Sequence, residues 1–196
     1  MTVHITTVAT AITIFLLGSA ALAADGNPDG GTSKLPLSFN GGHEIARNDY
    51  GRPCALIAAA LGVETEVFRK AFSGVTPAHG RGPTREEARR NKEAMMKVLA
   101  PHGVTNERLD EVANYYRYRP QDGELWPTRE AKGYAVVEGG KVTRVVVTEP
   151  GSGYNTPPVV SVEGMKGVRL KVTLALGKDL KTNGGVAEVV AEPSDR

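Results

Sequence analysis

Residues 141–162, KVTRVVVTEPGSGYNTPPVVSV, decide the fold of the C-terminal part of the chain. Valines alternate with polar residues in two runs, and glycines and prolines separate these runs, a pattern typical of short strands joined by a turn. Just before this stretch, residues 133–138 have the same period of two, and Gly139-Gly140 can make a tight turn. The pattern predicts a β-hairpin followed by a glycine-rich turn and another strand.

More strands are expected on the C-terminal side of this hairpin. They fall at residues 159–163, 168–176 and 186–191. Glycines separate them, and Asn183-Gly184 is typical of a hairpin turn. We therefore interpret residues 133–192 as a small all-β module, sandwich-like or barrel-like, near the size at which a single hydrophobic core is marginal.

The sequence of this module repeats in part. Residues 140–150 are echoed by residues 185–193, and the second copy stops before the Gly-Ser-Gly-Tyr of residues 151–154. The turn, tyrosine, prolines and following strand within residues 142–162 resemble a β-repeat of secreted bacterial and phage-tail proteins. The resemblance implies an extracellular β scaffold and no particular reaction. Because glycine and proline fix the backbone around it, Tyr154 is expected to pack over a turn.

Upstream of this module the apolar residues have helical spacing instead. Pro53 can occupy the first position of a helix that Gly62 ends, and a second short helix follows at residues 67–72. Residues 84–87, Thr-Arg-Glu-Glu, form a capping box that begins a third helix. Thr105 can cap a fourth.

Together these segments predict an α+β protein in which a small N-terminal four-helix module is followed by the all-β module. We expect the helices to pack as an orthogonal bundle over residues 51–119, with a hinge at residues 120–132 and the β module after it. The helical part is similar to part of an uncharacterised group of secreted bacterial proteins. That match implies no activity.

The N-terminal region predicts export. The first 24 residues contain no Lys, Arg, Asp or Glu, and an apolar run at residues 8–17 precedes the Ala-Leu-Ala of residues 21–23. This is typical of a signal peptide, with cleavage expected after Ala23. Residues 24–50, rich in Gly, Asn, Pro and Asp, are interpreted as a flexible linker. The expected location is secreted or periplasmic, with membrane attachment only if residues 1–23 are retained.

Composition excludes several classes of protein. The chain has 196 residues, 24 Lys and Arg against 22 Asp and Glu, and one Cys. Such balanced charge is not typical of a polyanion binder, so we expect no nucleic-acid partner. A single cysteine cannot make an intrachain disulfide or the paired motifs of a zinc ribbon, a thioredoxin-type site or a c-type haem attachment. We expect no cofactor.

Aromatic and basic residues gather between the two modules. The candidate binding residues are Tyr115, Arg117, Tyr118, Arg119 and Trp126. Aromatic faces beside guanidinium groups can stack sugars and pair with carboxylates. The competing interpretation is that Tyr118 and Trp126 pack the two modules against each other. In either case, this surface is where we expect a protein or carbohydrate partner.

Histidines supply a second set of candidates. His43 and Glu44, together with His79 or His102, could ligate a metal ion, because zinc accepts imidazole and carboxylate ligands. The second histidine of an H-E-x-x-H motif is missing, and adjacent residues of an extended loop point to opposite sides. Solvated loop histidines are therefore the competing interpretation.

Cys54 is the only candidate thiol nucleophile. The N-terminus of a helix would lower its pKa, and a loop histidine could act as its base. However, Cys54 lies in the first turn of an apolar helix and belongs to no recognisable catalytic signature, which favours a structural thiol.

Two classes of function follow from these patterns. The first is a secreted or periplasmic, non-enzymatic binding or structural protein. The alternative is a small hydrolase or metal-dependent enzyme that uses the loop histidines with Glu44 or Cys54. Catalysis needs hydrogen-bond or coordination distances, so the two classes are distinguished by whether these side chains converge in a cleft.

Overall fold

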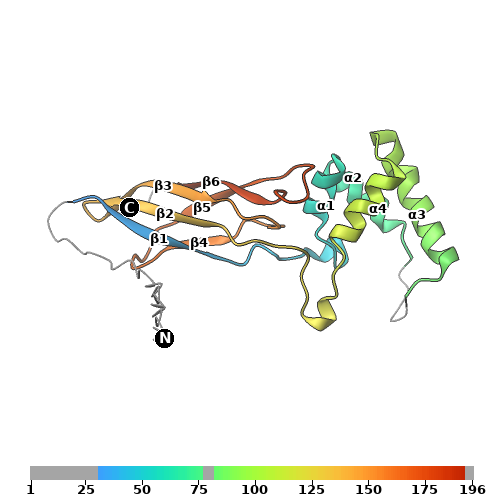
Figure 1. The fold of residues 1–196 in the computed structure, drawn as a ribbon, viewed down its shortest axis with the longest axis horizontal. Coiled ribbons are helices and arrows are strands. Elements are labelled where there is room, and N and C mark those ends of the chain that lie inside the picture. Colours follow the sequence, from blue (N-terminus) through green and yellow to red (C-terminus); the bar gives the residue numbers. More distant parts are fainter. Residues whose placement is uncertain (1–30, 77–81, 193–196) are drawn as a thin grey trace, which may run out of the picture.

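A computed structural model of the chain describes residues 31–76 and 82–192, which form an elongated molecule with strands at one end and helices at the other (Figure 1). The strands are β1 (Ser33–Asn40), β2 (Lys132–Glu138), β3 (Lys141–Glu149), β4 (Val159–Val162), β5 (Leu170–Ala175) and β6 (Gly185–Ala191). The helices are α1 (Cys54–Leu61), α2 (Thr65–Ser73), α3 (Arg85–Leu99) and α4 (Asn106–Tyr115), with the short 3-10 helices η1 (Arg47–Asp49), η2 (Ala100–His102) and η3 (Pro120–Asp122). The signal peptide expected at residues 1–23 lies outside the described residues.

The strands make two antiparallel sheets, one of order β3-β2-β1-β4 and one of order β5-β6. The predicted hairpin between β2 and β3 is confirmed, and its turn residues Gly139 and Gly140 have φ values of 55° and 75°. Side chains from both sheets share one hydrophobic core, which includes Val137 and Val162 of the first sheet and Val189 of the second. Neither sheet faces solvent on both sides, because each covers an apolar face of the other.

The predicted order of a four-helix module followed by an all-β module is wrong. β1 precedes all the helices in the chain, yet it lies inside the larger sheet, between β2 and β4. The helices are therefore inserted between two neighbouring strands of one sheet. The flexible linker expected at residues 24–50 is likewise wrong over Ser33–Asn40, since this segment is a strand whose Leu37 and Phe39 are buried.

Pro36 explains why this strand is hard to recognise. Proline lacks an N–H and normally indicates an edge strand or a loop. In β1 the pairing partner changes at this point: residues up to Pro36 pair with β2, and residues from Leu37 onward pair with β4. The Pro36 carbonyl accepts a hydrogen bond of 3.0 Å from the N–H of Glu163, just beyond the end of β4. The missing N–H lies on the same side, at the end of the pairing with β4, so the proline removes at most the last hydrogen bond of that ladder.

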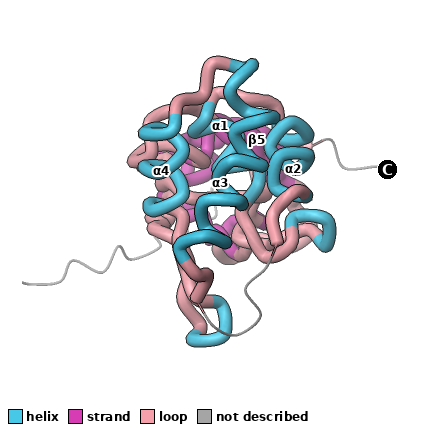
Figure 2. Tube along the Cα trace, turned by 90° about the vertical axis from the view of Figure 1, so that its right-hand side faces the viewer, coloured by secondary structure: helices cyan, strands magenta, loops and turns pink. Residues whose placement is uncertain are grey.

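The helix signals in the sequence are confirmed, except that α1 begins at Cys54 with Pro53 as its N-cap and not as its first residue. Gly62 ends α1 with a φ of 75°, and the Thr84 hydroxyl accepts from the Glu87 N–H while the Glu87 carboxylate accepts from the Thr84 N–H. The Thr105 hydroxyl caps α4 by accepting from the Arg108 N–H. These helices bury a second hydrophobic core, and Figure 2 shows them lying across the end of the sheets.

Candidate binding site at the junction of helices and strands

The Gly-Ser-Gly-Tyr turn at residues 151–154 lies where the chain passes between helices and strands. Ser152 exchanges both backbone hydrogen bonds with Arg129, at 2.9 and 3.0 Å. Gly151 has a φ of 66°, and a Cβ atom there would lie 2.5 Å from the Arg129 carbonyl oxygen. Only glycine permits this close approach of two backbones. The turn therefore fixes the position of the segment that carries Arg129.

Trp126 and Tyr118 are buried at this same place, with 1% and 8% of their surfaces exposed. Their rings meet edge to face with centroids 5.2 Å apart. The Trp126 indole N–H donates to the Gly153 carbonyl at 2.8 Å, and the Tyr118 hydroxyl donates to the Gly51 carbonyl at 2.6 Å. Both rings therefore pack protein against protein, as expected of amphipathic aromatic residues between two structural units.

Tyr154 packs over the turn in the way that the sequence predicts. It is 2% exposed, and its hydroxyl accepts a hydrogen bond of 2.9 Å from the Ala131 N–H. Burial raises the pKa of this phenol. The His43 ring stacks on Tyr154 at a centroid distance of 5.3 Å and lies 6.0 Å from the ring of Trp126. His43 thus joins an aromatic residue of the sheet core to one of the helical core.

Asn183 completes the contact between helices and strands. Its amide group donates to the Leu56 carbonyl and to the Tyr116 hydroxyl, both at 2.8 Å, and accepts from the Gly177 N–H at 3.0 Å. Asn183 and Tyr116 are almost wholly buried, and burial raises the pKa of Tyr116 to about 12. We call the contact made by Tyr118, Trp126, Tyr154 and Asn183 the junction.

The five predicted binding residues divide into two groups. Tyr118 and Trp126 come together inside the junction, where no ligand can stack on them. Tyr115 is half-buried, with its ring 5.0 Å from that of Tyr116. Arg117 and Arg119 are exposed and, among the described residues, make hydrogen bonds only to residues close to them in the chain. An Arg117 guanidinium N–H donates to the Asn114 side chain of α4, and the Arg119 backbone N–H donates to the Glu124 carboxylate.

The predicted metal ligands are not brought together in the described residues. The Glu44 carboxylate accepts from the Gly42 N–H and the Thr156 hydroxyl, which lowers its pKa. Burial lowers the pKa of His43, and His102 is exposed on η2. His79 lies outside the described residues. Within residues 31–76 and 82–192, no three His, Cys, Asp or Glu side chains form a group that could hold a metal ion.

Cys54 is a buried thiol. It has no exposed surface, and its Sγ–H points at the Asp49 carbonyl with an S···O distance of 3.7 Å. Burial, together with the nearby carboxylate of Asp49, raises the pKa of Cys54 to about 12. The expectation that the helix N-terminus would lower this pKa is therefore wrong, because desolvation outweighs the helix dipole.

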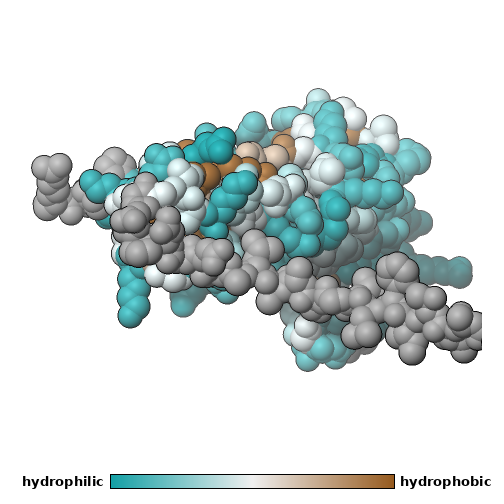
Figure 3. All heavy atoms as spheres, turned by 60° about the vertical axis from the view of Figure 1, so that its left-hand side comes forward, coloured by the Kyte–Doolittle hydropathy of each residue, from teal (hydrophilic) through white to brown (hydrophobic). Residues whose placement is uncertain are grey.

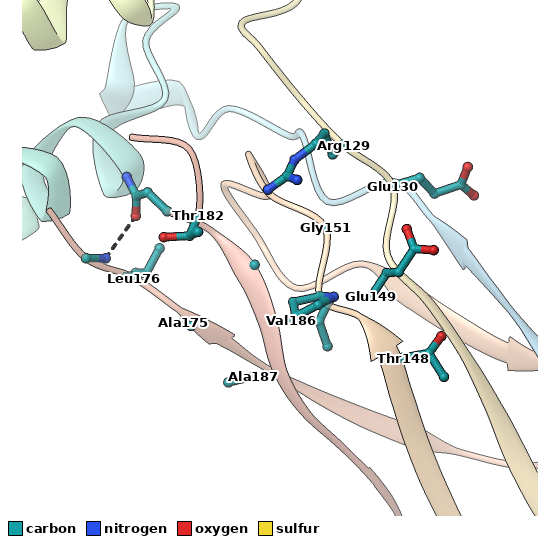
Figure 4. Close-up of a pocket in the computed structure, with 14 residues that line it drawn as sticks. Arg129, Glu130, Thr148, Glu149, Gly151, Ala175, Leu176, Thr182, Val186 and Ala187 are labelled. Atoms are coloured by element: carbon teal, nitrogen blue, oxygen red, sulfur yellow. Dashed lines mark hydrogen bonds between the residues drawn. The ribbon is translucent and has the colours of Figure 1, made fainter. Parts of the chain in front are cut away.

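A groove of about 580 Å³ opens beside the junction (Figure 4). It lies where β3 ends and β6 begins, and we call it the Arg129 groove. Small residues and a proline in its lining are Pro150, Gly151, Gly185, Val186 and Ala187. Larger residues in its lining include Arg129, Glu130, Glu149, Thr182 and Leu176. Figure 4 shows the Arg129 side chain reaching toward Thr182, whereas the carboxylates of Glu130 and Glu149 point away from it.

Arg129 is held in place on the rim of this groove. Its Nε–H donates to the Ser152 hydroxyl at 3.2 Å, and its Nη2–H donates to the Lys181 carbonyl at 2.8 Å. Arg129 also borders a neighbouring hollow of about 310 Å³ that Tyr115 and Lys181 line. Tyr115 therefore lies beside Arg129, which the sequence does not indicate as a site residue, and neither Arg117 nor Arg119 lines this hollow.

The sequence predicts a hinge over residues 120–132 and does not indicate that Arg129, which lies in it, belongs to a site. Its partners Ser152 and Lys181 are 23 and 52 residues away along the chain. No local sequence motif indicates contacts between residues so far apart in the chain.

The chain was compared with models of protein families, with curated proteins and with solved structures, and it matches none of them. Among the residues that the structure describes, no helix has the length and apolar character needed to cross a membrane.

Proposed function

We propose that this chain is an exported, non-enzymatic binding protein and that its ligand lies in the Arg129 groove. The observation that carries the proposal is the guanidinium group of Arg129, which two hydrogen bonds fix at the rim of an open groove. Arginine has five N–H donors in a planar fork, so donors remain for a carboxylate of the ligand. Because the side chain is already ordered, binding loses little of its conformational entropy.

The lining of the groove favours an extended segment of a partner protein. Glycine, alanine and proline in the lining leave room for a backbone to approach closely, and Leu176 is 48% exposed for contact with an apolar side chain. A carbohydrate would be expected to stack on exposed aromatic faces, but Trp126 and Tyr118 are buried. We therefore propose a peptide ligand that carries an Asp, a Glu or a terminal carboxylate.

The junction supports this proposal because it holds the two walls of the groove in a fixed arrangement. Asn183 lines the groove and is hydrogen-bonded to α1 and to Tyr116. Ser152 and Lys181, which hold Arg129, belong to the segments that form the junction. Ser152 precedes Gly153, which accepts the Trp126 hydrogen bond, and Lys181 lies two residues before Asn183. A preformed groove is typical of binding sites, which need few rearrangements when the ligand arrives.

The experiment is selection of peptides from a phage-displayed random library on the chain from residue 24 onward. We expect enriched peptides to share an acidic position and to bind Arg129→Gln at least about tenfold more weakly than wild type. Arg129→Lys keeps the charge but loses the fork, so its affinity should fall between the two. Arg47→Gln, at an exposed arginine outside both grooves, is the matched control.

Other outcomes would contradict the proposed function. Peptides whose affinity is unchanged in Arg129→Gln would place the binding surface elsewhere. Binding of neutral or acidic glycans on an array, in the absence of peptide binding, would favour a carbohydrate partner. The urea midpoints of all variants should be compared first, so that a loss of affinity is not confused with a loss of folding.

Export is the second part of the proposal. It rests on the sequence of residues 1–23, and it predicts that the protein recovered from the periplasm or the medium begins at Ala24. Intact-mass spectrometry of the full-length gene product measures this directly. A mass that retains the first 23 residues would show a membrane anchor or no processing at all.

A further inference from the structure

The two sheets separate along one side of the molecule, between β3 and β6. The Val186 N–H donates to the Pro150 carbonyl at 2.8 Å, where β6 begins and β3 ends. Beyond that point, within the described part of the chain, no backbone hydrogen bond joins the two strands. A shallow groove of about 710 Å³ lies between them, which we call the β3–β6 groove. Both strands are therefore sheet edges with open backbone groups, a feature that favours association.

The β3–β6 groove is lined by valines together with polar side chains and open backbone groups of the two strands. Its lining residues are Val142, Thr143, Arg144, Val145, Val146, Val147, Ala187, Glu188, Val189, Val190 and Ala191. Val190 is 40% exposed, and the β3 valines are half-buried. Figure 3 shows an apolar strip bordered by hydrophilic side chains on the sheet end of the molecule. Exposed valine beside open strand edges is typical of an interaction site.

The two charged residues of the groove occupy equivalent positions in the sequence echo. Residues 141–145 read KVTRV and residues 185–189 read GVAEV, so Arg144 corresponds to Glu188. The contact between Val186 and Pro150 shows that the two strands run antiparallel. Glu188 therefore lies near the end of β3, and Arg144 lies toward the opposite end of the groove. Neither forms an ion pair with another residue that the structure describes.

We propose that the β3–β6 groove is the interface of a two-fold symmetric dimer of this chain. A two-fold axis perpendicular to the long direction of the groove exchanges the two ends of the groove. It brings Arg144 of one copy close to Glu188 of the other, and this pair occurs twice in the dimer. The valine surface of one copy then covers the same surface of the other. Such self-complementarity is what an isologous interface requires. The dimer does not depend on the proposed peptide ligand, because the Arg129 groove meets this surface only at Ala187.

The charge pattern selects a second copy over an unrelated partner. The groove has one positive and one negative residue, at opposite ends. After a two-fold rotation, each of them faces the opposite charge on the second copy. They offer an unrelated acidic or basic partner no net attraction. Covering the open strand edges and burying the exposed part of Val190 supply the affinity, and the two ion pairs fix the orientation.

Sedimentation equilibrium of the chain from residue 24 onward, from about 1 to 200 µM, tests the dimer. We expect Arg144→Glu and Glu188→Arg each to raise the dimer dissociation constant at least about tenfold, because each places two like-charge pairs in the interface. The double variant Arg144→Glu with Glu188→Arg exchanges the charges and is expected to restore the wild-type constant. Both positions are exposed, so folding should survive in all three variants.

Val190→Glu and Val159→Glu form a matched pair for the same measurement. Val190 lines the groove, whereas Val159 is 74% exposed on β4, at the opposite edge of the larger sheet. We expect Val190→Glu to abolish the dimer and Val159→Glu to leave it unchanged. A wild-type chain that stays monomeric at 200 µM would overturn the proposal. So would a dimer that is insensitive to the single charge reversals, or a double variant that fails to recover.

Discussion

The junction and the β3–β6 groove are both places where two packed units meet, but they differ in how the contact is closed. The junction is closed by buried rings and side-chain hydrogen bonds, whereas the groove has one backbone hydrogen bond at its end. Buried polar groups need partners, so the junction is specific and does not tolerate substitution. Open strand edges can be covered or paired from outside, and in our proposal another copy of the chain does this.

The Arg129 groove lies between the rigid junction and the open β3–β6 groove. It shares Asn183 with the junction and Ala187 with the β3–β6 groove. A binding surface gains from such a position, because one wall is held in place while the other remains accessible. Substitutions in the junction should therefore lower stability strongly, and substitutions in the β3–β6 groove should affect association instead.

Trp126→Ala should have the largest effect. It removes a ring that is 1% exposed and leaves the Gly153 carbonyl without its indole donor, so we expect a loss of about 3–5 kcal/mol in the free energy of unfolding. Urea denaturation at low protein concentration measures it. Val190→Ala in the β3–β6 groove is the control and should change stability by no more than about 0.5 kcal/mol. Equal effects of the two substitutions would contradict the distinction between the regions.

Asn183→Ala should be nearly as damaging. It leaves the Leu56 carbonyl, the Tyr116 hydroxyl and the Gly177 N–H without their partner. Each buried polar group without a partner costs about 1–3 kcal/mol, and partial relaxation makes a total loss of about 3 kcal/mol the expected result. Asn40→Ala, which removes an exposed amide bonded to the Ser38 hydroxyl, should be close to neutral. A loss below about 1 kcal/mol for Asn183→Ala would show that water can replace this contact.

Gly184→Ala separates packing at the junction from backbone strain. Gly184 and Gly164 have φ values of 71° and 75°, so alanine is similarly strained at both positions. A Cβ at Gly184 would lie 2.5 Å from the Leu56 side chain and 2.6 Å from the Tyr154 carbonyl oxygen, whereas one at Gly164 meets nothing within 4 Å. We expect Gly184→Ala to be more destabilising by about 1–3 kcal/mol in the same urea experiment. Equal losses would mean that the junction can shift to admit a methyl group.

The sequence predicts the parts of this fold that local signals determine. The capping box at Thr84, the end of α1 at Gly62 and the turn at Gly139-Gly140 each follow from interactions within a few residues. β1 was not predicted because Pro36 normally indicates an edge strand or a loop, although Leu35, Leu37 and Phe39 alternate with Pro36, Ser38 and Asn40. The change of pairing partner at Pro36 is what allows a proline inside this strand. The order of modules was wrong for this single reason.

The candidate site could be predicted only in part, and for a similar reason. The sequence indicates that aromatic and basic residues gather near residues 115–126, but it does not distinguish buried rings from exposed ones. Trp126 is buried because the Gly153 carbonyl, 27 residues away, accepts its N–H. Arg129 becomes important because Ser152 and Lys181 hold it. Contacts of this kind depend on how the two ends of the molecule meet, which no local pattern records.

The smallest expected effect is a pH dependence of the junction through His43. Burial lowers the pKa of His43 below its ordinary value of 6.5, and the neighbouring Glu44 opposes this shift without cancelling it. Its Nε2 atom is buried and has no hydrogen-bond partner among the described residues. Arg129 and Glu130, which border the same hollow as His43, carry opposite charges, so their effects on the imidazole oppose each other. Protonation is therefore less favourable in the folded state than in the unfolded state.

The sign of the effect follows from proton binding in the two states. Below pH 6.5 the unfolded chain binds a proton at His43 more readily than the folded chain, so stability rises with pH in that range. The contribution of His43 is complete above pH 6.5 and is lost as the pH falls through the lower, folded pKa. His43→Gln removes the titrating group, and subtracting its unfolding free energy from that of wild type at each pH cancels the groups that both proteins share. The difference should decline from pH 7 to pH 5, and a difference that is flat or rises toward low pH would mean that the junction accepts a charged imidazole.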